Sequence, residues 1–136
     1  MIYENSNPLL IPRLLEMAKT IPDLPIPELE KMLIGGISST NTKIFVEEKG
    51  EEIRGFLFCS IEGFDGQDAC FVQVCAIKPT NEENNIGFEL LNRVKLWAKE
   101  KNLEYIYFIT KRNAKGFEKK YHFKYYGTVL RKKLEE

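Results

Sequence analysis

The stretch from Phe71 to Phe123 decides the fold. Its segments are FVQVCAI (71–77), KPTNEENN (78–85), IGFELLNRVKLWAKEKN (86–102), LEYIYFI (103–109) and AKGFEKKYHF (114–123). The first and fourth segments are apolar at successive positions, which is typical of strands covered on both faces, whereas the third carries an apolar stripe at helical spacing. We therefore predict a strand, a polar loop, a long helix, a strand and a short basic helix, in that order.

The polar loop, which opens on Pro79, joins the first of these strands to the long helix. The first N–H groups of a helix have no partner within the helix, and the helix dipole adds partial positive charge at that end. A helix start that follows a strand can therefore hold an anion such as a phosphate. The sequence predicts an anion site where the long helix begins.

Two short helices are predicted before the first strand. Asn5 or Asn7 can cap a helix that starts near Pro8, because proline is tolerated in a first turn. A second helix starts near Pro27 and is ended by Gly35–Gly36.

The remaining apolar segments are predicted to be strands. They are KIFVEE (43–48), IRGFLFCSI (53–61), ACFVQVCAI (69–77) and the tail YYGTVLRKKL (125–134). Turns at Lys49–Glu52 and in GFDGQD (63–68) join the first three of them. Helices and strands in this order predict an α/β or α+β fold of three layers with a mixed, mostly antiparallel sheet, in a single domain over residues 1–136.

Composition excludes several classes of protein. The chain has 20 basic and 20 acidic residues, so bulk charge gives no reason to expect nucleic acid or an anionic membrane as a partner. Acidic residues dominate from Asp23 to Glu62 and basic residues from Lys111 to Lys133, which is either a solvated surface or a field that attracts a polyphosphate. No apolar run could span a bilayer and no signal peptide is evident, so we expect a cytoplasmic protein.

Three cysteines, Cys59, Cys70 and Cys75, lie in apolar strand segments without the spacing of a metal site. Cys59 and Cys70 are placed symmetrically about the GFDG turn and could face each other across a hairpin. Free buried thiols are the expectation in a reducing compartment.

The order of elements from Phe71 onward resembles the acyl-CoA half of the GNAT N-acetyltransferases. Members of that family place a proline after their fourth strand and then a loop of pattern Arg/Gln-x-x-Gly-x-Gly/Ala. Here the loop aligns as Glu82-Glu83-Asn84-Asn85-Ile86-Gly87. The final glycine is kept, and Asn85 replaces the middle glycine with a residue that tolerates a left-handed φ. Glu82 departs from the pattern, and its carboxylate and that of Glu83 oppose a pyrophosphate unless they point away.

A second match to the family lies in the last helix. Many members carry Asn followed by Ala-x-x-Phe-Tyr-Glu-Lys-x-Gly-Phe, and this chain has Asn113-Ala114-Lys115-Gly116-Phe117-Glu118-Lys119-Lys120-Tyr121-His122-Phe123. Glu118 stands where the family often has the tyrosine that protonates the leaving thiolate. Tyr121 lies about one helical turn further on, so we predict Tyr121 rather than Glu118 as the proton donor. His122 replaces a common glycine.

The resemblance implies a mechanism in which acetyl-CoA is the co-substrate. Pantetheine lies between the fourth and fifth strands, against backbone groups near Cys75 and Ile77, and a neutral amine attacks the thioester directly. Gln73 is the nearest match to a glutamate that often relays the amine proton, and an amide cannot act as a base. The implied cofactor-binding residues are Cys75, Ile77, Asn84, Asn85, Ile86, Gly87, Phe88 and Asn113, and the implied catalytic residues are Tyr121 and Glu118.

Three hypotheses of function follow. The first is an N-acetyltransferase that acts on a primary amine of a small molecule or peptide. The second is a non-catalytic GNAT-fold binding or regulatory protein with altered or lost CoA binding, which the altered loop and the altered proton-transfer positions favour. The third is an unrelated α/β protein whose basic tail contacts nucleic acid.

The acceptor and the oligomeric state are left open by the sequence. In this family the acceptor pocket forms around the first helices, here Ile21–Ser39, where Asp23, Glu28 and Glu30 could favour a cationic amine or could be solvated carboxylates. An edge strand at KIFVEE or YYGTVL could pair with a second copy to give a homodimer.

Overall fold

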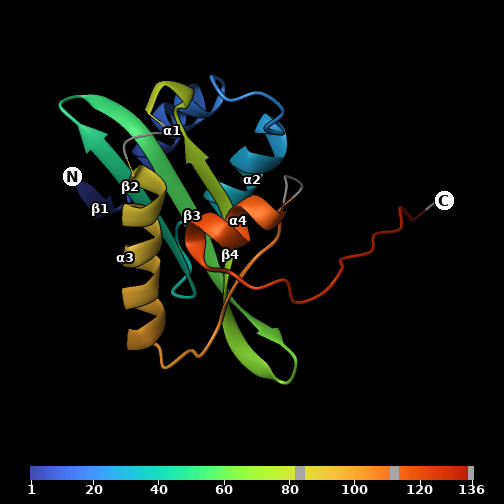
Figure 1. Ribbon diagram of the computed structural model, residues 1–136. Helices are drawn as coiled ribbons and strands as arrows, with labels where there is room; N and C mark the ends of the chain where they lie inside the picture. Colours follow the sequence, from blue (N-terminus) through green and yellow to red (C-terminus); the bar gives the residue numbers. More distant parts are fainter. Residues whose placement is uncertain (82–84, 111–113, 135–136) are drawn as a thin grey trace.

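A five-stranded sheet in the order β1-β2-β3-β4-β5 organises the chain (Figure 1). The computed structural model describes residues 1–81, 85–110 and 114–134. The strands are β1 (Ile2–Glu4), β2 (Thr42–Lys49), β3 (Glu52–Phe64), β4 (Gln67–Ile77) and β5 (Ile106–Phe108). Neighbouring strands are antiparallel except β4 and β5, which are parallel. The prediction of a mixed, mostly antiparallel sheet is confirmed.

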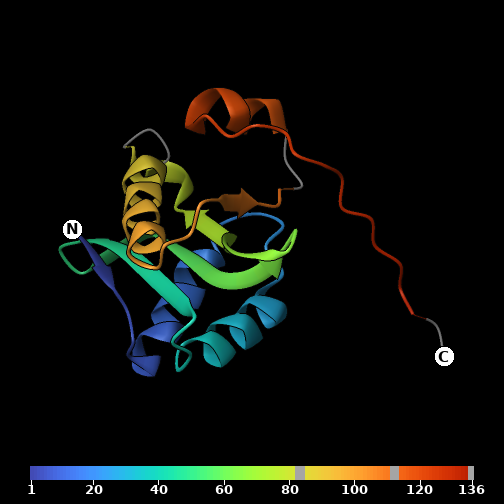
Figure 2. The same ribbon diagram turned by 90° about the horizontal axis from the view of Figure 1, so that it is seen from below.

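Helices cover both faces of this sheet (Figure 2). The α-helices are α1 (Ile11–Ala18), α2 (Ile26–Gly36), α3 (Ile86–Glu100) and α4 (Ala114–Tyr121), and short 3-10 turns η1 (Pro8–Leu10) and η2 (Pro79–Asn81) precede α1 and α3. Asn7 caps the first turn, where its side chain accepts a hydrogen bond from the Leu9 N–H at 3.0 Å. In Figure 2, α1 and α2 lie on one side of the sheet and α3 and α4 on the other, which gives the three predicted layers.

The core has two parts because successive strand residues point to opposite faces. Ile44, Val46, Phe56 and Phe58 pack against α1 and α2, together with buried residues of these helices such as Leu14 and Leu33. Residues of the same strands that alternate with them pack against α3. This second cluster includes Phe45, Leu57, Cys59, Cys70, Val72, Ile86, Leu90, Val94 and Trp97.

Both predicted hairpins are present. β3 and β4 are joined by Asp65 and Gly66, whose φ angles are 52° and 80°, between the paired residues Phe64 and Gln67. Two successive residues with positive φ are typical of a type I′ turn, whose twist suits a hairpin, and Asp-Gly is a favoured sequence for it.

A buried ion pair lies where β2 and β3 change register. Glu47 is 1% exposed and accepts a hydrogen bond from Arg54 Nε at 2.6 Å and a second from Arg54 Nη2. Arg54 is the additional residue between Gly55, opposite Glu47, and Ile53, opposite Glu48. The bulge therefore turns the guanidinium toward the buried carboxylate, which also accepts a hydrogen bond from the Met1 amino group at 3.2 Å.

Three sequence predictions differ from the structure. The strand at KIFVEE is not an edge, because β1 pairs with it through Ile2–Glu47, Tyr3–Val46 and Glu4–Phe45. β1 is three residues long, too short to show a period in the sequence. The strand predicted at Leu103–Ile109 is reduced to β5, and the tail from Tyr125 to Leu134 is not part of the sheet. Its apolar side chains stay exposed, with Leu130 at 88%, and it runs away from the sheet in Figure 1.

Replacing Glu47 with Gln is expected to lower the free energy of unfolding by about 3 kcal/mol at neutral pH, because it leaves the Arg54 guanidinium without its charge partner. Urea denaturation of the full chain measures this change. Glu52→Gln is the matched control, since it removes an exposed carboxylate that is paired with Lys78 at 2.8 Å, and a much smaller change is expected.

Stability should also depend on pH through Glu47. The hydrogen bonds from Arg54 hold the pKa of this carboxyl below its ordinary value of 4.5, against the effect of burial. Its stabilisation is therefore complete above the ordinary pKa and is lost as the pH falls through the lower, folded-state pKa. A Glu47→Gln variant should lack the part of the acid-induced loss of stability that Glu47 causes. If the free energy of unfolding depends on pH as in the wild type, Glu47 is not the group responsible.

Candidate active site

The paired part of β4 and β5 ends abruptly in the middle of β4. Among the described residues, the β4–β5 register consists of Cys70–Ile106, Phe71–Tyr107 and Val72–Phe108, whereas β4 continues to Ile77. The register of β3 and β4 shifts at the same place: Cys59 lies opposite Val72 and Phe58 opposite Val74, so that Gln73 is the additional residue of a bulge. Beyond it, the side of β4 that faced β5 borders a gap in the ladder that an extended ligand could fill.

Cys75 and Ile77 lie on this part of β4, as predicted. Both are half-buried and face the α3 side of the sheet. At Gly55 on the neighbouring strand, an added Cβ would lie 3.2 Å from Ile86 Cγ2, so the first turn of α3 packs closely on the sheet. The end of β4 and the start of α3 are thereby held against each other.

The start of α3 has the geometry that the sequence predicts. Asn85 is the N-terminal cap with φ 57°, and its side chain makes no capping hydrogen bond. The Glu89 N–H donates to the Asn85 carbonyl at 3.1 Å, which places Ile86, Gly87 and Phe88 in the first turn, ahead of the helical ladder. The N–H groups of a first turn point along the helix axis toward an incoming anion. Asn84, Glu82 and Glu83 lie outside the described residues.

Tyr121 reaches across from α4 to this helix start. An added Cβ on Gly87 would lie 2.4 Å from the Tyr121 hydroxyl oxygen and 3.2 Å from Ile77 Cδ1. The Tyr121 ring also packs on Phe88 with 4.8 Å between centroids, and Lys120 Nζ lies 5.3 Å from its centre. A glycine at position 87 therefore allows the Tyr121 phenol to approach the helix backbone closely, and it does not serve an unusual φ angle of its own. Glu118, half-buried, precedes Tyr121 on α4, while Asn113 lies outside the described residues.

The elements, their order and the interrupted β4–β5 ladder can now be compared with known proteins. The profile of the Acetyltransferase (GNAT) family matches residues 12–123. The chain belongs to this family. No curated protein gives a significant match.

Solved structures of GNAT proteins share the fold over almost the whole chain. Aminoglycoside 6'-N-acetyltransferase AAC(6')-Ig from Acinetobacter haemolyticus has a TM-score of 0.83 at 11% identity, covering 100% of this chain and 99% of that one. A predicted acetyltransferase from Clostridium acetobutylicum, solved with acetyl-CoA, has a TM-score of 0.77 at 18% identity, covering 98% and 96%. AAC(6')-Iy, in complex with a bisubstrate analogue, CoA-S-monomethyl-acetylneamine, has a TM-score of 0.80 at 13% identity, covering 99% and 97%. At these identities the likeness shows the fold.

His122, which replaces a glycine common in GNAT sequences, ends α4 in the left-handed region with φ 61°. A helix commonly ends on a glycine in this conformation, because a Cβ is crowded there. The substitution keeps the backbone geometry at the cost of local strain, and the exposed imidazole lies directly after Tyr121.

Gln73 occupies the bulge where the family often has a glutamate. Its Nε2 donates to the Ser60 Oγ at 3.0 Å, so its side chain is directed along the α1–α2 side of the sheet. Sequence comparison alone could find the residue but not the bulge that separates it from the paired part of β4.

The cysteines are free in the structure, as expected. Cys59 and Cys70 are buried on the α3 side, but they are offset in register, Cys59 lying opposite Val72 and Ile61 opposite Cys70. A thiol–thiol hydrogen bond and burial raise the pKa of Cys59, which keeps it a neutral thiol. Among the described residues, no three His, Cys, Asp or Glu side chains gather into a metal site, and no helix there has the length and apolar character needed to cross a membrane.

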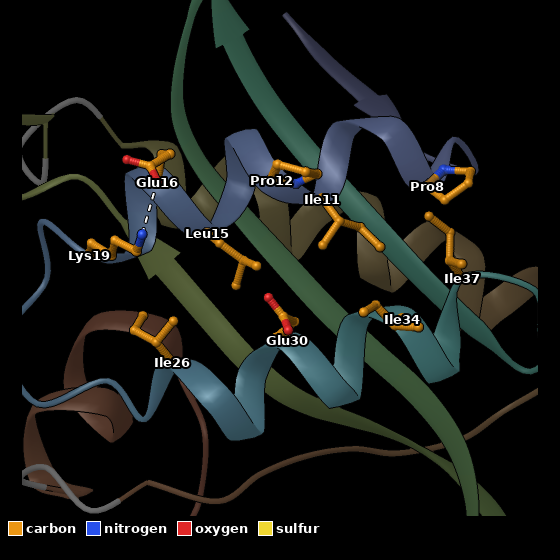
Figure 3. A pocket seen from close by; sticks show the side chains of 10 residues that line it. All are labelled: Pro8, Ile11, Pro12, Leu15, Glu16, Lys19, Ile26, Glu30, Ile34 and Ile37. Atoms are coloured by element: carbon orange, nitrogen blue, oxygen red, sulfur yellow. Dashed lines mark hydrogen bonds and ion pairs between the residues drawn. The ribbon is translucent and has the colours of Figure 1, made fainter.

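A groove of about 600 Å³ lies between α1 and α2, on the face of the two helices that is turned away from the sheet (Figure 3). It contains Ile26, Glu30, Ile34 and Ile37 from the segment predicted to form the acceptor pocket. Glu16 and Lys19 form an ion pair of 2.9 Å at one end of it. Because the helices and the sheet separate this groove from the start of α3, we do not place the acetyl-transfer site in it.

Gly87→Ala is expected to destabilise the fold by about 1–3 kcal/mol, because the added methyl group meets the Tyr121 hydroxyl at 2.4 Å. Gly116→Ala in α4 is the control: an added Cβ there has no neighbour within 4 Å, and alanine favours a helix. The double variant Gly87→Ala/Tyr121→Phe should regain part of the lost stability, because the hydroxyl that meets the added methyl group is absent. Thermal unfolding of the three variants measures this. Equal effects of the two glycine substitutions would contradict this contact.

His122→Gly is expected to raise the free energy of unfolding by about 1 kcal/mol, because glycine adopts the left-handed region without strain. His122→Ala is compared with it in urea denaturation, since both remove the imidazole but only glycine removes the strain. If the two variants have the same stability, the strain assigned to His122 is absent.

Proposed function

We propose that the protein is an N-acetyltransferase that moves the acetyl group of acetyl-CoA to a primary amine. One observation carries the proposal: the end of the interrupted edge of β4 lies beside the start of α3, where a Cβ added to Gly87 would lie 3.2 Å from Ile77 Cδ1. Pantetheine can lie along Gln73–Ile77 as an added strand, and the pyrophosphate can then meet the N–H groups of Ile86, Gly87 and Phe88. The exposed Lys115, Lys119 and Lys120 on α4 add positive charge nearby.

The reaction is written as direct transfer. The lone pair of a neutral amine forms a bond to the thioester carbonyl carbon, and the carbon–sulfur bond breaks with its electron pair going to sulfur. The amine loses one proton and the CoA thiolate gains one, so that amide and free CoA are the products. A backbone N–H of β4 beyond the bulge is suited to stabilise the oxyanion, and no protein nucleophile is required.

The position of Tyr121 supports a role in cofactor binding beside its predicted role as proton donor. Its hydroxyl lies at the first turn of α3, whereas the paired part of β4 ends at Val72. Val72 and Ile77 are five residues apart, which is about 17 Å of extended chain. Tyr121 therefore lies close to the proposed pyrophosphate, and a donor role requires the sulfur to approach α4.

Tyr121→Phe separates these two roles. A hydroxyl that binds the cofactor should, when removed, raise the KM for acetyl-CoA with little change in kcat, whereas loss of a proton donor should lower kcat by about 100-fold or more. Steady-state kinetics with varied acetyl-CoA measures both. Unchanged values of kcat and KM would remove Tyr121 from the site.

A non-catalytic CoA-binding protein is the second candidate, favoured by Gln73, whose amide is hydrogen-bonded to Ser60 and cannot take a proton from the amine. Turnover of acetyl-CoA in the presence of an amine panel decides between the two. Acetylated product, identified by mass, supports the enzyme, whereas binding without turnover supports the second candidate.

Calorimetry with acetyl-CoA, desulfo-CoA and ATP tests the shared premise. We expect micromolar binding of both CoA species and at least a tenfold weaker affinity in Gly87→Val, whose side chain obstructs the helix start. Gly116→Ala should bind as the wild type does. No binding at millimolar acetyl-CoA would overturn both candidates.

A further inference from the structure

A cluster of aromatic side chains lies on the sheet outside the proposed CoA track. Phe71 and Tyr107 are stacked across the β4–β5 pair with 5.1 Å between centroids. Phe64 meets the Tyr107 ring edge-on at 4.8 Å, and Tyr126 of the tail meets it at 5.6 Å. Tyr105 lies 6.1 Å from Tyr107. These five residues are called the aromatic surface below.

The aromatic surface is on the α1–α2 side of the sheet but is not covered by these helices. Val72, Ile106 and Phe108 belong to the core under α3, so the alternating residues Phe71 and Tyr107 face the other way. The β3–β4 hairpin projects away from α1 and α2 in Figure 1, and Phe64 at its end is 39% exposed. Tyr105, which directly precedes β5, is 52% exposed. Open aromatic faces of this kind attract cations.

Acidic residues lie beside the rings. The hairpin segment Glu62–Asp68 (EGFDGQD) contains three acidic residues and no basic one. Asp65 accepts a hydrogen bond from the Tyr126 hydroxyl, which brings a carboxylate to the aromatic surface. This bond raises the pKa of Tyr126 to about 12, so the phenol stays neutral beside the carboxylate. Rings and carboxylates together favour a positively charged group over a neutral one of the same shape.

The aromatic surface adjoins the point where acetyl transfer is proposed. Gln73 follows Phe71 by two residues, and its hydrogen bond to Ser60, which lies opposite Phe71, shows that it is on the same side of the sheet. Two residues of extended chain span about 7 Å. A ligand on the rings can therefore extend to the interrupted edge of β4 over a distance of about 7 Å.

We propose that the aromatic surface binds a protonated amino group of a diamine or polyamine acceptor while a second, neutral amino group attacks the thioester at the interrupted edge. This inference rests on the proposed function and names its substrate class. Attack requires an uncharged nitrogen, so the charge that the aromatic surface recognises belongs to a different nitrogen of the same molecule. The spacing of about 7 Å fits a chain of four or five carbons between the two nitrogens.

Binding is tested first, without any CoA compound. Choline and its neutral isostere 3,3-dimethylbutan-1-ol are titrated into the full chain and followed by amide chemical shifts. We expect choline to bind about tenfold more tightly, with shifts at Phe71 and Tyr107. Equal affinities, or choline shifts confined to other residues, would overturn the cation site.

Matched variants assign the effect to the rings and the charge. Tyr107→Phe keeps the ring and should keep the discrimination, whereas Tyr107→Leu should abolish it. Tyr105→Leu makes the same change at a position that is 52% exposed, so we expect it to disturb the fold less than Tyr107→Leu does. Asp65→Asn removes the charge at a position with φ 52°, which asparagine tolerates. It should lower the affinity for choline but not the affinity for the neutral isostere. Discrimination that survives both leucine variants would overturn the proposal.

Catalysis is tested with 1,5-diaminopentane and pentylamine. We expect kcat/KM to be about tenfold higher for the diamine, and Tyr105→Leu to raise the KM for the diamine alone. If kcat/KM is similar for the two amines and no ring variant changes it, this inference is overturned, while the proposed N-acetyltransferase function stands. Selective choline binding without acetylation of any amine would overturn the proposed function, and with it the acceptor role, while the cation site would stand.

The basic tail of a second copy is another cation that could lie on these rings. Size-exclusion chromatography with light scattering, with and without 10 mM choline, distinguishes an interface between copies from a small-molecule site. A monomer in both conditions supports the small-molecule site. A dimer that choline dissociates would overturn the acceptor role in favour of an interface between copies.

Discussion

Three pairs of residues between β4 and β5 determine how the catalytic side of this protein is built. A parallel pair requires a crossover, and here the crossover is α3, which packs on the same face of the sheet that the alternating residues Cys70, Val72 and Phe108 line. In the described part of the chain the β4–β5 pairing stops at Val72, while β4 stays paired with β3 up to Ile77. The bulge at Gln73 shifts the register of β4 against β3 at the point where β5 leaves.

The local geometry at the ends of α3 and α4 explains why the chain tolerates substitutions in its family motifs. The motif glycines meet two different physical requirements. At Asn85 and His122 the requirement is a left-handed φ, which asparagine adopts readily and histidine adopts with strain. At Gly87 the requirement is space for the Tyr121 hydroxyl, which an added Cβ would displace, and there the glycine is present. The helix start from Asn85 to Phe88 therefore has a backbone that suits an anion.

The sheet also separates two kinds of surface. The α3–α4 side carries the helix start and the lysines of α4, which suit a polyphosphate, whereas the open aromatic surface and the acidic hairpin lie on the opposite side and suit a cation. The two sides of the sheet meet at the interrupted edge of β4. A charge-neutral sequence thus divides into a basic and an acidic region, an arrangement that suits the proposed binding of acetyl-CoA and a cationic amine.

The sequence by itself determined β2, β3, β4, the helices and the backbone form of the helix start that is predicted to hold an anion, because apolar periodicity, the Pro-led loop and the tolerance of Asn85 for a left-handed φ are local properties of the chain. It could not determine that β1 covers β2, that the tail leaves the sheet, or that β5 is only three residues long, because pairing depends on partners far along the chain. The contact of Tyr121 with Gly87 and the stacking of Phe71 on Tyr107 likewise join residues more than thirty positions apart. Only the tertiary structure decided these, since a side chain shows its face and its neighbours only after the strand register is set.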